Sequence, residues 1–438
     1  MRGRKGTREA LEAALAAEPD DSAAHMAYAD FLIEQGDPRG EFIAVQLALE
    51  DPTRLPGERK KLRQREKSLL KKHEREWLGE LAPLLLGTPE EQRSLFAAEL
   101  QPQYADRLDY TTEHMEFRHS WSRGWLDRFE CDNITVEMAR KLGRAPVARL
   151  LRALVCHGDE EGGLFRYEPG LDIPPGEWPR FHPCEVLAHY PAVHNLRVFQ
   201  YGREVDPEED RYWSGTQYQR LAPLVKHMPR LEELRIFGHI YMDDEMWQDM
   251  HRLLSLPTLT HLRVYQHYHG TTYALEPLAT NPALGRLSHL LIFPHSSARS
   301  FDPIHLGTNA WIGAREGPAL LRDNVRAVVT SPHLTSLTHL QLRCCNGGDA
   351  MITDIVASGI LKRLKLLDLR HGHVGDEGAG LLASCPDARN LEVLDLTNNR
   401  LTEAGVAALG IAGIRVRADR QQGAPYNDDA IPYCGDTE

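Results

Sequence analysis

A repeat of 27 or 28 residues constrains the fold of this 438-residue chain more than any other feature. The segments "LEELRIFGH", "LTHLRVYQH" and "LSHLLIFPH" begin at 231, 259 and 287, and each starts 28 residues after the last. The segments "LTHLQLRCC", "LKLLDLRHG" and "LEVLDLTNN" begin at 337, 364 and 391, which are 27 residues apart. A unit this short cannot bury its own apolar face, so we expect the units to stack into one continuous core.

The repeated segments resemble the leucine-rich repeat, LxxLxLxxN/CxL, in its ribonuclease-inhibitor-like form. The last unit, "LEVLDLTNNRLTEAGVAALG", is the clearest match, with Asn399 at the asparagine position and Thr402 opening a helix. The resemblance covers residues 190–410 well and 120–190 loosely, where "WLDRFEC" at 125–131 is a candidate first strand. It implies an α/β leucine-rich-repeat solenoid, with a curved parallel sheet inside, helices outside, and a role in binding other proteins.

Residues 1–85 lack the repeat and predict a small all-helical domain. We expect helices at about 7–17, from Asp20 or Asp21 to Gln35, from Pro38, and at about 57–79. The segment "HMAYADFLIEQGDPRGEFIAVQ" resembles the bacterial repeat-companion domain, a helical module found beside repeat arrays that brings no established activity. The remaining segments are a linker or capping segment at 86–120, the repeat array at 121–414 with insertions near 157–190, 201–220 and 295–325, and a C-terminal tail at 415–438.

Residues between the inward leucines form the concave face of the predicted sheet, because strand residues alternate sides. Aligning the strands gives three columns on this face. The first column holds Asn195, Glu233, His261, His289, His339, Leu366 and Val393. The second holds Arg197, Arg235, Arg263, Leu291, Gln341, Asp368 and Asp395. The third holds Phe199, Phe237, Tyr265, Phe293, Arg343, Arg370 and Thr397, so an arginine column lies beside an aromatic column.

The concave face is therefore the predicted binding surface. Adjacent strands lie about 4.8 Å apart, so neighbouring arginines repel, and exposed aromatic rings forgo burial. Arginine and aromatic residues are also enriched at interface hot spots. We expect a protein partner with an acidic or aromatic-compatible surface; the alternative is a solvated face without a partner. The candidate partner-binding residues are Arg197, Phe199, Arg235, Phe237, His261, Arg263, Tyr265, Phe293, Arg343 and Arg370.

The motif search favours a non-enzymatic protein without a cofactor. The sequence contains no GxSxG, GxxxxGK[ST] or HExxH motif, and no catalytic residue is singled out. His239, His267 and His295 stand at the asparagine position of consecutive repeats, and we expect them to be buried and bonded to backbone groups. A metal-dependent enzyme built on repeat histidines is the alternative, to which His371 and His373 also belong.

Residues 58–78 predict a basic helix with nine Lys and Arg, which raises a nucleic-acid or anionic-surface adaptor as a further alternative. However, residues 1–80 hold 15 basic and 16 acidic residues, and the rest carries −11 of the net charge of −12. We therefore expect residues 1–80 to pack against the start of the array and not to bind nucleic acid. Irregularly spaced cysteines and the lack of a long apolar run favour a cytoplasmic protein without membrane insertion.

Overall fold

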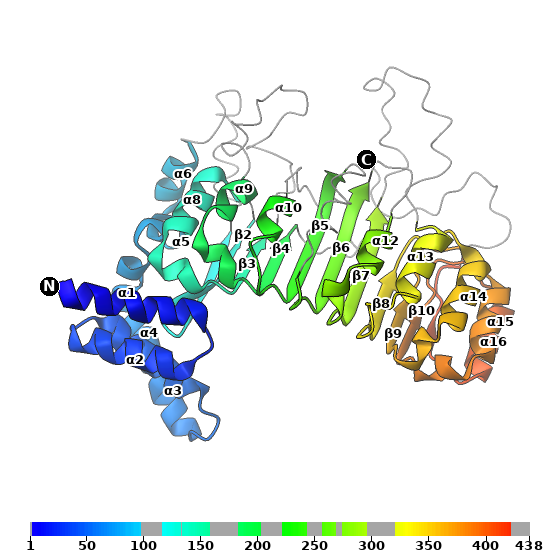
Figure 1. Cartoon of the computed structure of the whole chain (residues 1–438), viewed down its shortest axis with the longest axis horizontal. Coiled ribbons are helices and arrows are strands. Elements are labelled where there is room, and N and C mark those ends of the chain that lie inside the picture. Colours follow the sequence, from blue (N-terminus) through cyan, green and yellow to red (C-terminus); the bar gives the residue numbers. More distant parts are fainter. Residues whose placement is uncertain are drawn as a thin grey trace, which may run out of the picture. The chain divides into compact units, whose positions relative to one another are not determined.

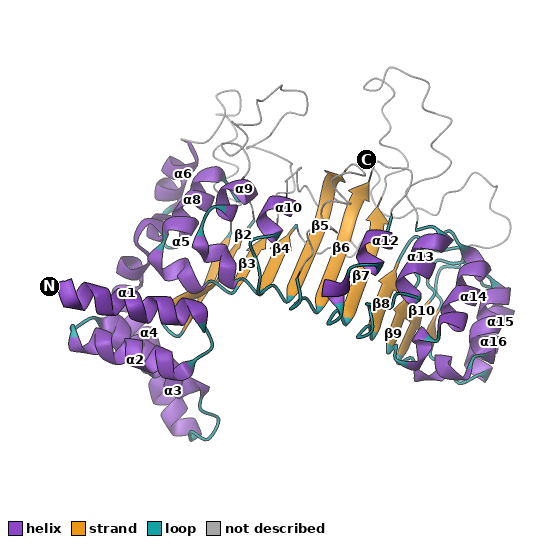
Figure 2. Ribbon diagram, viewed as in Figure 1, coloured by secondary structure: helices purple, strands orange, loops and turns teal. Residues whose placement is uncertain are grey.

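A computed structural model of the chain describes residues 2–97, 116–132, 134–157, 183–202, 221–242, 256–268, 274–295 and 320–421. It divides into two compact units. The first comprises Met1–His157, Gly163–Phe199 and His227–Arg230, and the second comprises Gly158–Gly162, Gln200–Lys226 and Leu231–Glu438. Figures 1 and 2 show the helices and strands of both units. Most residues of the three expected insertions lie outside the described part of the chain.

The first unit opens with helices, as the sequence predicts. They are α1 (Arg2–Ala17), α2 (Ser22–Glu34), α3 (Pro38–Glu50), α4 (Pro56–Leu78), α5 (Ala82–Leu85) and α6 (Pro89–Ala97). Asp21 and Asp37 cap α2 and α3, because each carboxylate accepts the backbone N–H of the residue two positions later. Gly36, between the two helices, has a φ of 74°, a left-handed conformation that glycine adopts without strain.

A hairpin begins the sheet of the first unit. Strand β1 (Phe117–Ser122) runs antiparallel to β2 (Trp125–Cys131), which is parallel to β3 (Ala153–Cys156), and β4 (Val198–Tyr201) lies next to β3. Helices α8 (Val136–Arg144) and α9 (Pro183–Ala188) precede β3 and β4 respectively. The strand predicted at 125–131 is confirmed, but it is the second strand, because the antiparallel β1 precedes it.

The N-terminal helices pack directly on this hairpin, as expected for residues 1–80. The ring of Tyr28 stacks on that of Trp125 with centroids 5.7 Å apart. The guanidinium of Arg39 lies over the Trp125 ring, 4.3 Å from its centroid, and the Nε of Arg39 donates to Gly124 O at 2.8 Å. Tyr28 and Trp125 belong to a buried cluster made of Leu15, Tyr28, Ala29, Leu32, Ile43, Trp125 and Leu150. Helices and hairpin therefore share one core.

The second unit is a parallel sheet with helices. Its strands are β5 (Glu233–Met242), β6 (His261–Tyr268), β7 (His289–His295), β8 (His339–Leu342), β9 (Leu366–Asp368), β10 (Val393–Asp395) and β11 (Val416–Arg417), in this order. Its helices are α10 (Ala222–Val225), α12 (Glu276–Ala279), α13 (Arg322–Val329), α14 (Gly348–Ser358), α15 (Asp376–Ser384) and α16 (Glu403–Ile411). Helices α13–α16 pack side by side along β8–β10 (Figure 2). Strand β11 comes from the segment expected to be a tail.

The strands pair in the register that the repeat predicts. Arg235 is the Cα partner of Arg263, and His289 is the partner of both His261 and His339. Leucines at the intervening positions are fully buried; Leu234, Leu262, Leu290, Leu340, Leu367 and Leu394 are at most 1% exposed. A 27- or 28-residue spacing thus places equivalent residues side by side.

The last repeats turn through left-handed residues just after each strand. Cys344, His371 and Asn398 have φ values of 57°, 59° and 56°. Each donates its backbone N–H to a carbonyl of the following repeat, on Arg370, Thr397 and Asp419, at 2.9 to 3.1 Å. The same conformation and the same inter-repeat hydrogen bond therefore recur every 27 residues.

Candidate functional site

The open face of the second unit carries the predicted columns. We use this name for the sheet face formed by residues 233, 235 and 237 of β5 and their counterparts on β6–β10, opposite the buried leucines. Every position of the three columns described on these strands falls in the expected register. The sequence therefore predicted which residues are neighbours, and the structure adds what each side chain contacts.

The arginine column is paired with acids more closely than the sequence suggested. Arg235 donates to Glu233 at 2.7 Å and to Gln200 at 3.2 Å, so its charge is partly balanced by the acid two residues before it. Arg263 lies over the Phe237 ring, 5.7 Å from its centroid. In the first unit, Arg197 forms an ion pair with Asp20. Two guanidinium groups thus stand on adjacent strands β5 and β6, and that of Arg235 is paired with Glu233.

The aromatic column is buried, which corrects the expectation of exposed rings. Phe199 and Phe293 are fully buried, and Phe237 is 3% exposed. Phe237 and Phe293 form an apolar cluster with Leu291 and Cys344. Alternation along a strand predicts the face on which a ring lies, but not whether neighbouring side chains close over it. The side chain of Tyr265 lies outside the described part of the chain.

Two arginines contact the two rings of this apolar cluster. Arg263 lies over Phe237, and Arg343 lies over Phe293 at 5.4 Å from the ring centroid. A guanidinium over an aromatic face gains cation–π attraction and is restricted in its rotation. The buried rings therefore contact both arginines, of which Arg263 is partly exposed and Arg343 is buried.

Three histidines of the first column stack into a ladder across β6, β7 and β8. The ring centroids of His261 and His289, and of His289 and His339, are 4.0 Å apart, with interplanar angles of 17° and 15°. Each Nδ1 lies 2.8 or 2.9 Å from the hydroxyl of the preceding residue, Thr260, Ser288 or Thr338. Burial, followed by the two neighbouring rings, lowers the pKa of His289 to about 4, so this ring is neutral at pH 7.

The hydroxyl partners of the ladder were not predicted from the sequence. The signal that reveals them is a short motif, Leu-Ser/Thr-His-Leu, which occurs at 259–262, 287–290 and 337–340. It places a hydroxyl and an imidazole on consecutive residues at the start of three neighbouring strands. We name this group, His261, His289 and His339 with their hydroxyls, the histidine ladder.

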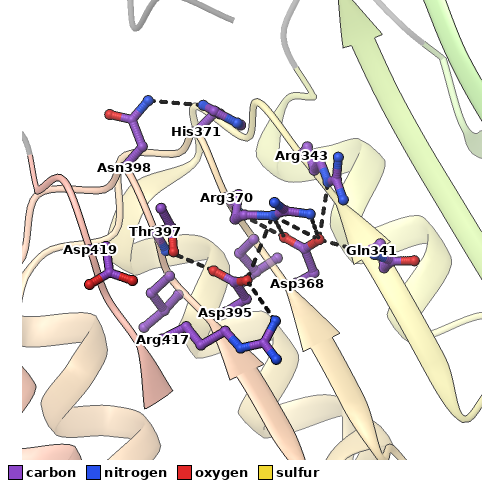
Figure 3. Close-up of polar contacts among 12 residues, drawn as sticks. Gln341, Arg343, Asp368, Arg370, His371, Asp395, Thr397, Asn398, Arg417 and Asp419 are labelled. Atoms are coloured by element: carbon purple, nitrogen blue, oxygen red, sulfur yellow. Dashed lines mark hydrogen bonds and ion pairs between the residues drawn. The ribbon is translucent and has the colours of Figure 1, made fainter. Parts of the chain in front are cut away.

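A buried carboxylate organises the C-terminal end of the open face (Figure 3). Asp368, 2% exposed, accepts hydrogen bonds from Arg343 at 3.0 Å, from Gln341 at 3.0 Å and from the side chain and backbone N–H of Arg370. Arg370 also lies 3.7 Å from Asp395. Burial raises the pKa of Asp368, but the two guanidinium charges outweigh it, and the net pKa is lowered.

The asparagine position is occupied by Cys345, Gly372 and Asn399 in the last three repeats. Asn399, fully buried, donates from Nδ2 to Leu369 O and accepts the N–H of Val374, both at 2.9 Å. Cys345, the counterpart two repeats earlier, donates its thiol to Leu342 O at 3.1 Å. The side chains of His239, His267 and His295 lie outside the described residues, so the expectation that they replace asparagine stays a prediction.

Metal ligation finds no geometric support in the described residues. They contain no group of three His, Cys, Asp or Glu side chains that fits a metal ion. His371 stacks on Phe293 with centroids 5.6 Å apart, and its Nδ1 faces the Asn398 amide at 2.9 Å. His373, two residues later, has a pKa lowered by burial and then by Arg400. These contacts and this burial are typical of histidines that stabilise the fold.

Comparisons with known proteins give one family match. Residues 363–383 and 387–410, which cover β9 with most of α15 and β10 with most of α16, match the family model for the leucine rich repeat. This part of the chain therefore carries leucine rich repeats. Among solved structures it is similar to a protein from Bacteroides fragilis, with 15% identity and a TM-score of 0.41 over 68% of this chain and 72% of that chain. A comparison with curated proteins found no match. None of the described helices has the length and apolar character to cross a membrane.

Proposed function

We propose that this chain is a non-enzymatic protein-interaction or scaffolding protein that binds an acidic segment of another protein on the open face. Leucine-rich repeats generally mediate protein–protein interaction, which supports the broad class. The proposed contact residues are Arg235, Arg263, His261, Arg343 and Arg370, with Phe237 and Phe293 beneath them. Arg197, Phe199 and Tyr265 from the sequence hypothesis stay further candidate contact residues.

The observation that carries the proposal is the contact of two arginines with buried aromatic rings. Arg263 over Phe237 and Arg343 over Phe293 place guanidinium groups against the two rings of one apolar cluster. A partner carboxylate would gain charge-assisted hydrogen bonds from such groups, and little side-chain entropy is lost because the arginines are already ordered. The chain carries a net charge of −12, whereas Arg235, Arg263, Arg343 and Arg370 gather on the open face, and this contrast favours an acidic partner.

We further propose that the helices of residues 1–85 are a repeat-companion module of a bacterial, cytoplasmic protein. The capped α2–α3 pair and its shared core with β2 support a role in closing that end of the repeat array. The six described cysteines are free thiols, which supports a reducing compartment. Cell fractionation of the native host with an antibody against the chain tests the location.

The test of the binding proposal is a charge reversal on the open face with a matched control. Arg235→Glu with Arg263→Glu is expected to lower affinity for the native partner about thirtyfold or more, since truncating a hot-spot residue costs about 2 kcal/mol. The control is Arg322→Glu with Arg326→Glu on helix α13, which changes the net charge equally, away from the open face. Quantitative affinity capture should show the loss only in the first variant. Equal capture by both variants would refute the proposed surface.

A further inference from the structure

Helix α4 presents a row of basic side chains to solvent. Six exposed basic residues lie toward one side of the helix; they are Lys60, Lys61, Arg63, Lys67, Lys71 and Lys72. The members at 60, 63, 67 and 71 recur every three or four residues, so they follow one face over a length of about 17 Å. The members at 61 and 72 are about three turns apart and widen this face. We call the six residues the basic row.

No member of the basic row has an acidic partner among the described residues. The four acids of α4 each contact a group outside the row; these contacts are Glu58 with the backbone N–H of Leu55, Glu66 with Gln46, Glu74 with His119 and Trp121, and Glu76 with His73. Acids on α3 and α6 pair with arginines outside the row; these pairs are Glu41 with Arg65, Glu50 with Arg123, and Glu91 with Arg75. In the described part of the first unit, no direct ion pair balances the charge of the row.

The row consists of lysines apart from one arginine, because the other arginines of α4 bind within the first unit. Arg65 and Arg75 form the ion pairs named above, and Arg59 donates to Asp51 O at 3.0 Å. Guanidinium groups recognise individual phosphates by paired hydrogen bonds, whereas an ammonium group acts as a hydrated point charge. Five lysines and one arginine therefore favour attraction to an extended anionic surface over contacts with the phosphates of a nucleic acid.

Two exposed leucines border the helix. Leu55, which is 66% exposed, directly precedes α4. Leu86, which is 37% exposed, follows α5, and its carbonyl oxygen lies 3.3 Å from Nη1 of Arg75. The interfacial region of a bilayer accommodates leucine side chains beside basic ones, whereas the backbone of a nucleic acid offers them no apolar contact. The leucines therefore point to a lipid surface as the partner of the basic row.

We propose that the basic row is a membrane-surface site that holds the first unit against a bilayer containing anionic phospholipids. Each Lys or Arg close to such a surface increases the partition of a protein about fivefold, so six unpaired charges suffice for stable association. The association is peripheral, because no described helix has the length and apolar character to cross a membrane. The site is separate from the open face, so it adds an activity to the proposed function.

The experiment is vesicle flotation with the full chain. One set of vesicles contains about 30% phosphatidylglycerol in phosphatidylcholine, and the other contains phosphatidylcholine alone. We expect binding to the anionic vesicles only, at about 0.1 M salt, and release at about 1 M salt, where the Debye length falls from about 10 Å to about 3 Å. Lys67→Glu/Lys71→Glu should lower the partition about 25-fold or more, because two contributions of about fivefold are lost.

Two further variants make the assay specific to the row. Lys60→Glu/Arg63→Glu, a second pair in the row, should show the same loss as Lys67→Glu/Lys71→Glu. Arg286→Glu/Arg415→Glu changes the net charge equally at exposed positions of the second unit, and it should float as the wild type does. Since all these side chains are exposed, the melting temperatures of the variants should match that of the wild type.

Three outcomes would overturn the inference. The first is a wild-type chain that floats with neither set of vesicles, or equally with both, since charge would then have no part in binding. The second is an equal loss in Arg286→Glu/Arg415→Glu, which would make net charge, and not the row, responsible. The third is submicromolar binding of duplex DNA that is lost in Lys67→Glu/Lys71→Glu while the vesicles stay unbound, which would assign the row to nucleic acid.

Discussion

Neutralising Asp368 should destabilise the second unit far more than its single charge suggests. The Asp368→Asn side chain has the same shape, but it leaves Arg343 and Arg370 without the carboxylate on which both depend. Removing one partner of a buried ion pair costs about 3–5 kcal/mol, because the remaining charge is buried and uncompensated. An asparagine oxygen still accepts one hydrogen bond, so we expect about 3 kcal/mol, the lower end of that range.

Thermal unfolding followed by calorimetry measures this cost. For a unit of this size, about 3 kcal/mol corresponds to a fall in melting temperature of about 6–12 °C. The control is Asp354→Asn, which breaks the more exposed Arg322–Asp354 pair and should cost about 1 kcal/mol or less. If the two variants melt within error of each other, the carboxylate does not organise this end of the sheet.

A double variant and the pH dependence sharpen the same prediction. Arg343→Met should cost less in the Asp368→Asn background than in the wild type, by about 1 kcal/mol or more, because the uncompensated charge is removed with it. The lowered pKa of Asp368 means that the carboxylate stays ionised in the folded state. The stability gap between wild type and Asp368→Asn should therefore be constant above about pH 5 and shrink below about pH 4, as the carboxylate is protonated.

Three further predictions concern other parts of the chain. Because the pKa of His289 is lowered to about 4, His289 binds a proton below about pH 6.5 in the unfolded chain but not in the folded chain. The free energy of unfolding should therefore be constant above that pH and fall by about 1–2 kcal/mol towards pH 4, and calorimetry of His289→Asn should show a smaller pH dependence. Arg39→Ala should cost about 2–3 kcal/mol and change Trp125 fluorescence, since it removes the buried hydrogen bond to Gly124 and the contact with the ring; unchanged urea unfolding would contradict this. Helix α4 should bind duplex DNA more weakly than about 1 μM near physiological salt, because Arg65 and Arg75 are paired with Glu41 and Glu91; submicromolar binding in a fluorescence anisotropy titration would favour the nucleic-acid alternative.

The sequence predicted the architecture through spacing and capping. A constant repeat length fixes which residues face each other across parallel strands, so the columns through Arg235 and His261 follow from counting alone. Asp21, Asp37 and Gly36 mark helix boundaries because their side chains or backbone satisfy local requirements. These features depend on neighbours in sequence or on one periodicity, and both are visible without coordinates.

Contacts between side chains of different repeats were less predictable. The burial of Phe237 and Phe293 depends on what closes over them, which a strand pattern does not encode. Strand β1 carries no repeat signal, since it pairs antiparallel and owes its place to the hairpin with β2. The hydroxyls of the histidine ladder precede their strands and fell outside the columns, although the recurring Leu-Ser/Thr-His-Leu motif contained the information.

The left-handed residues that follow β8, β9 and β10 have a consequence for how such a chain changes over generations. Cys344, His371 and Asn398 share one backbone conformation and one hydrogen bond to the next repeat, so the chain enters and leaves each unit in the same direction. Joining residue 344 directly to 372 would skip one complete unit and restore an equivalent junction. Insertion or loss of a part of a unit would misalign every later strand. Duplication and deletion are therefore tolerated in whole repeats, and the length of the array evolves in steps.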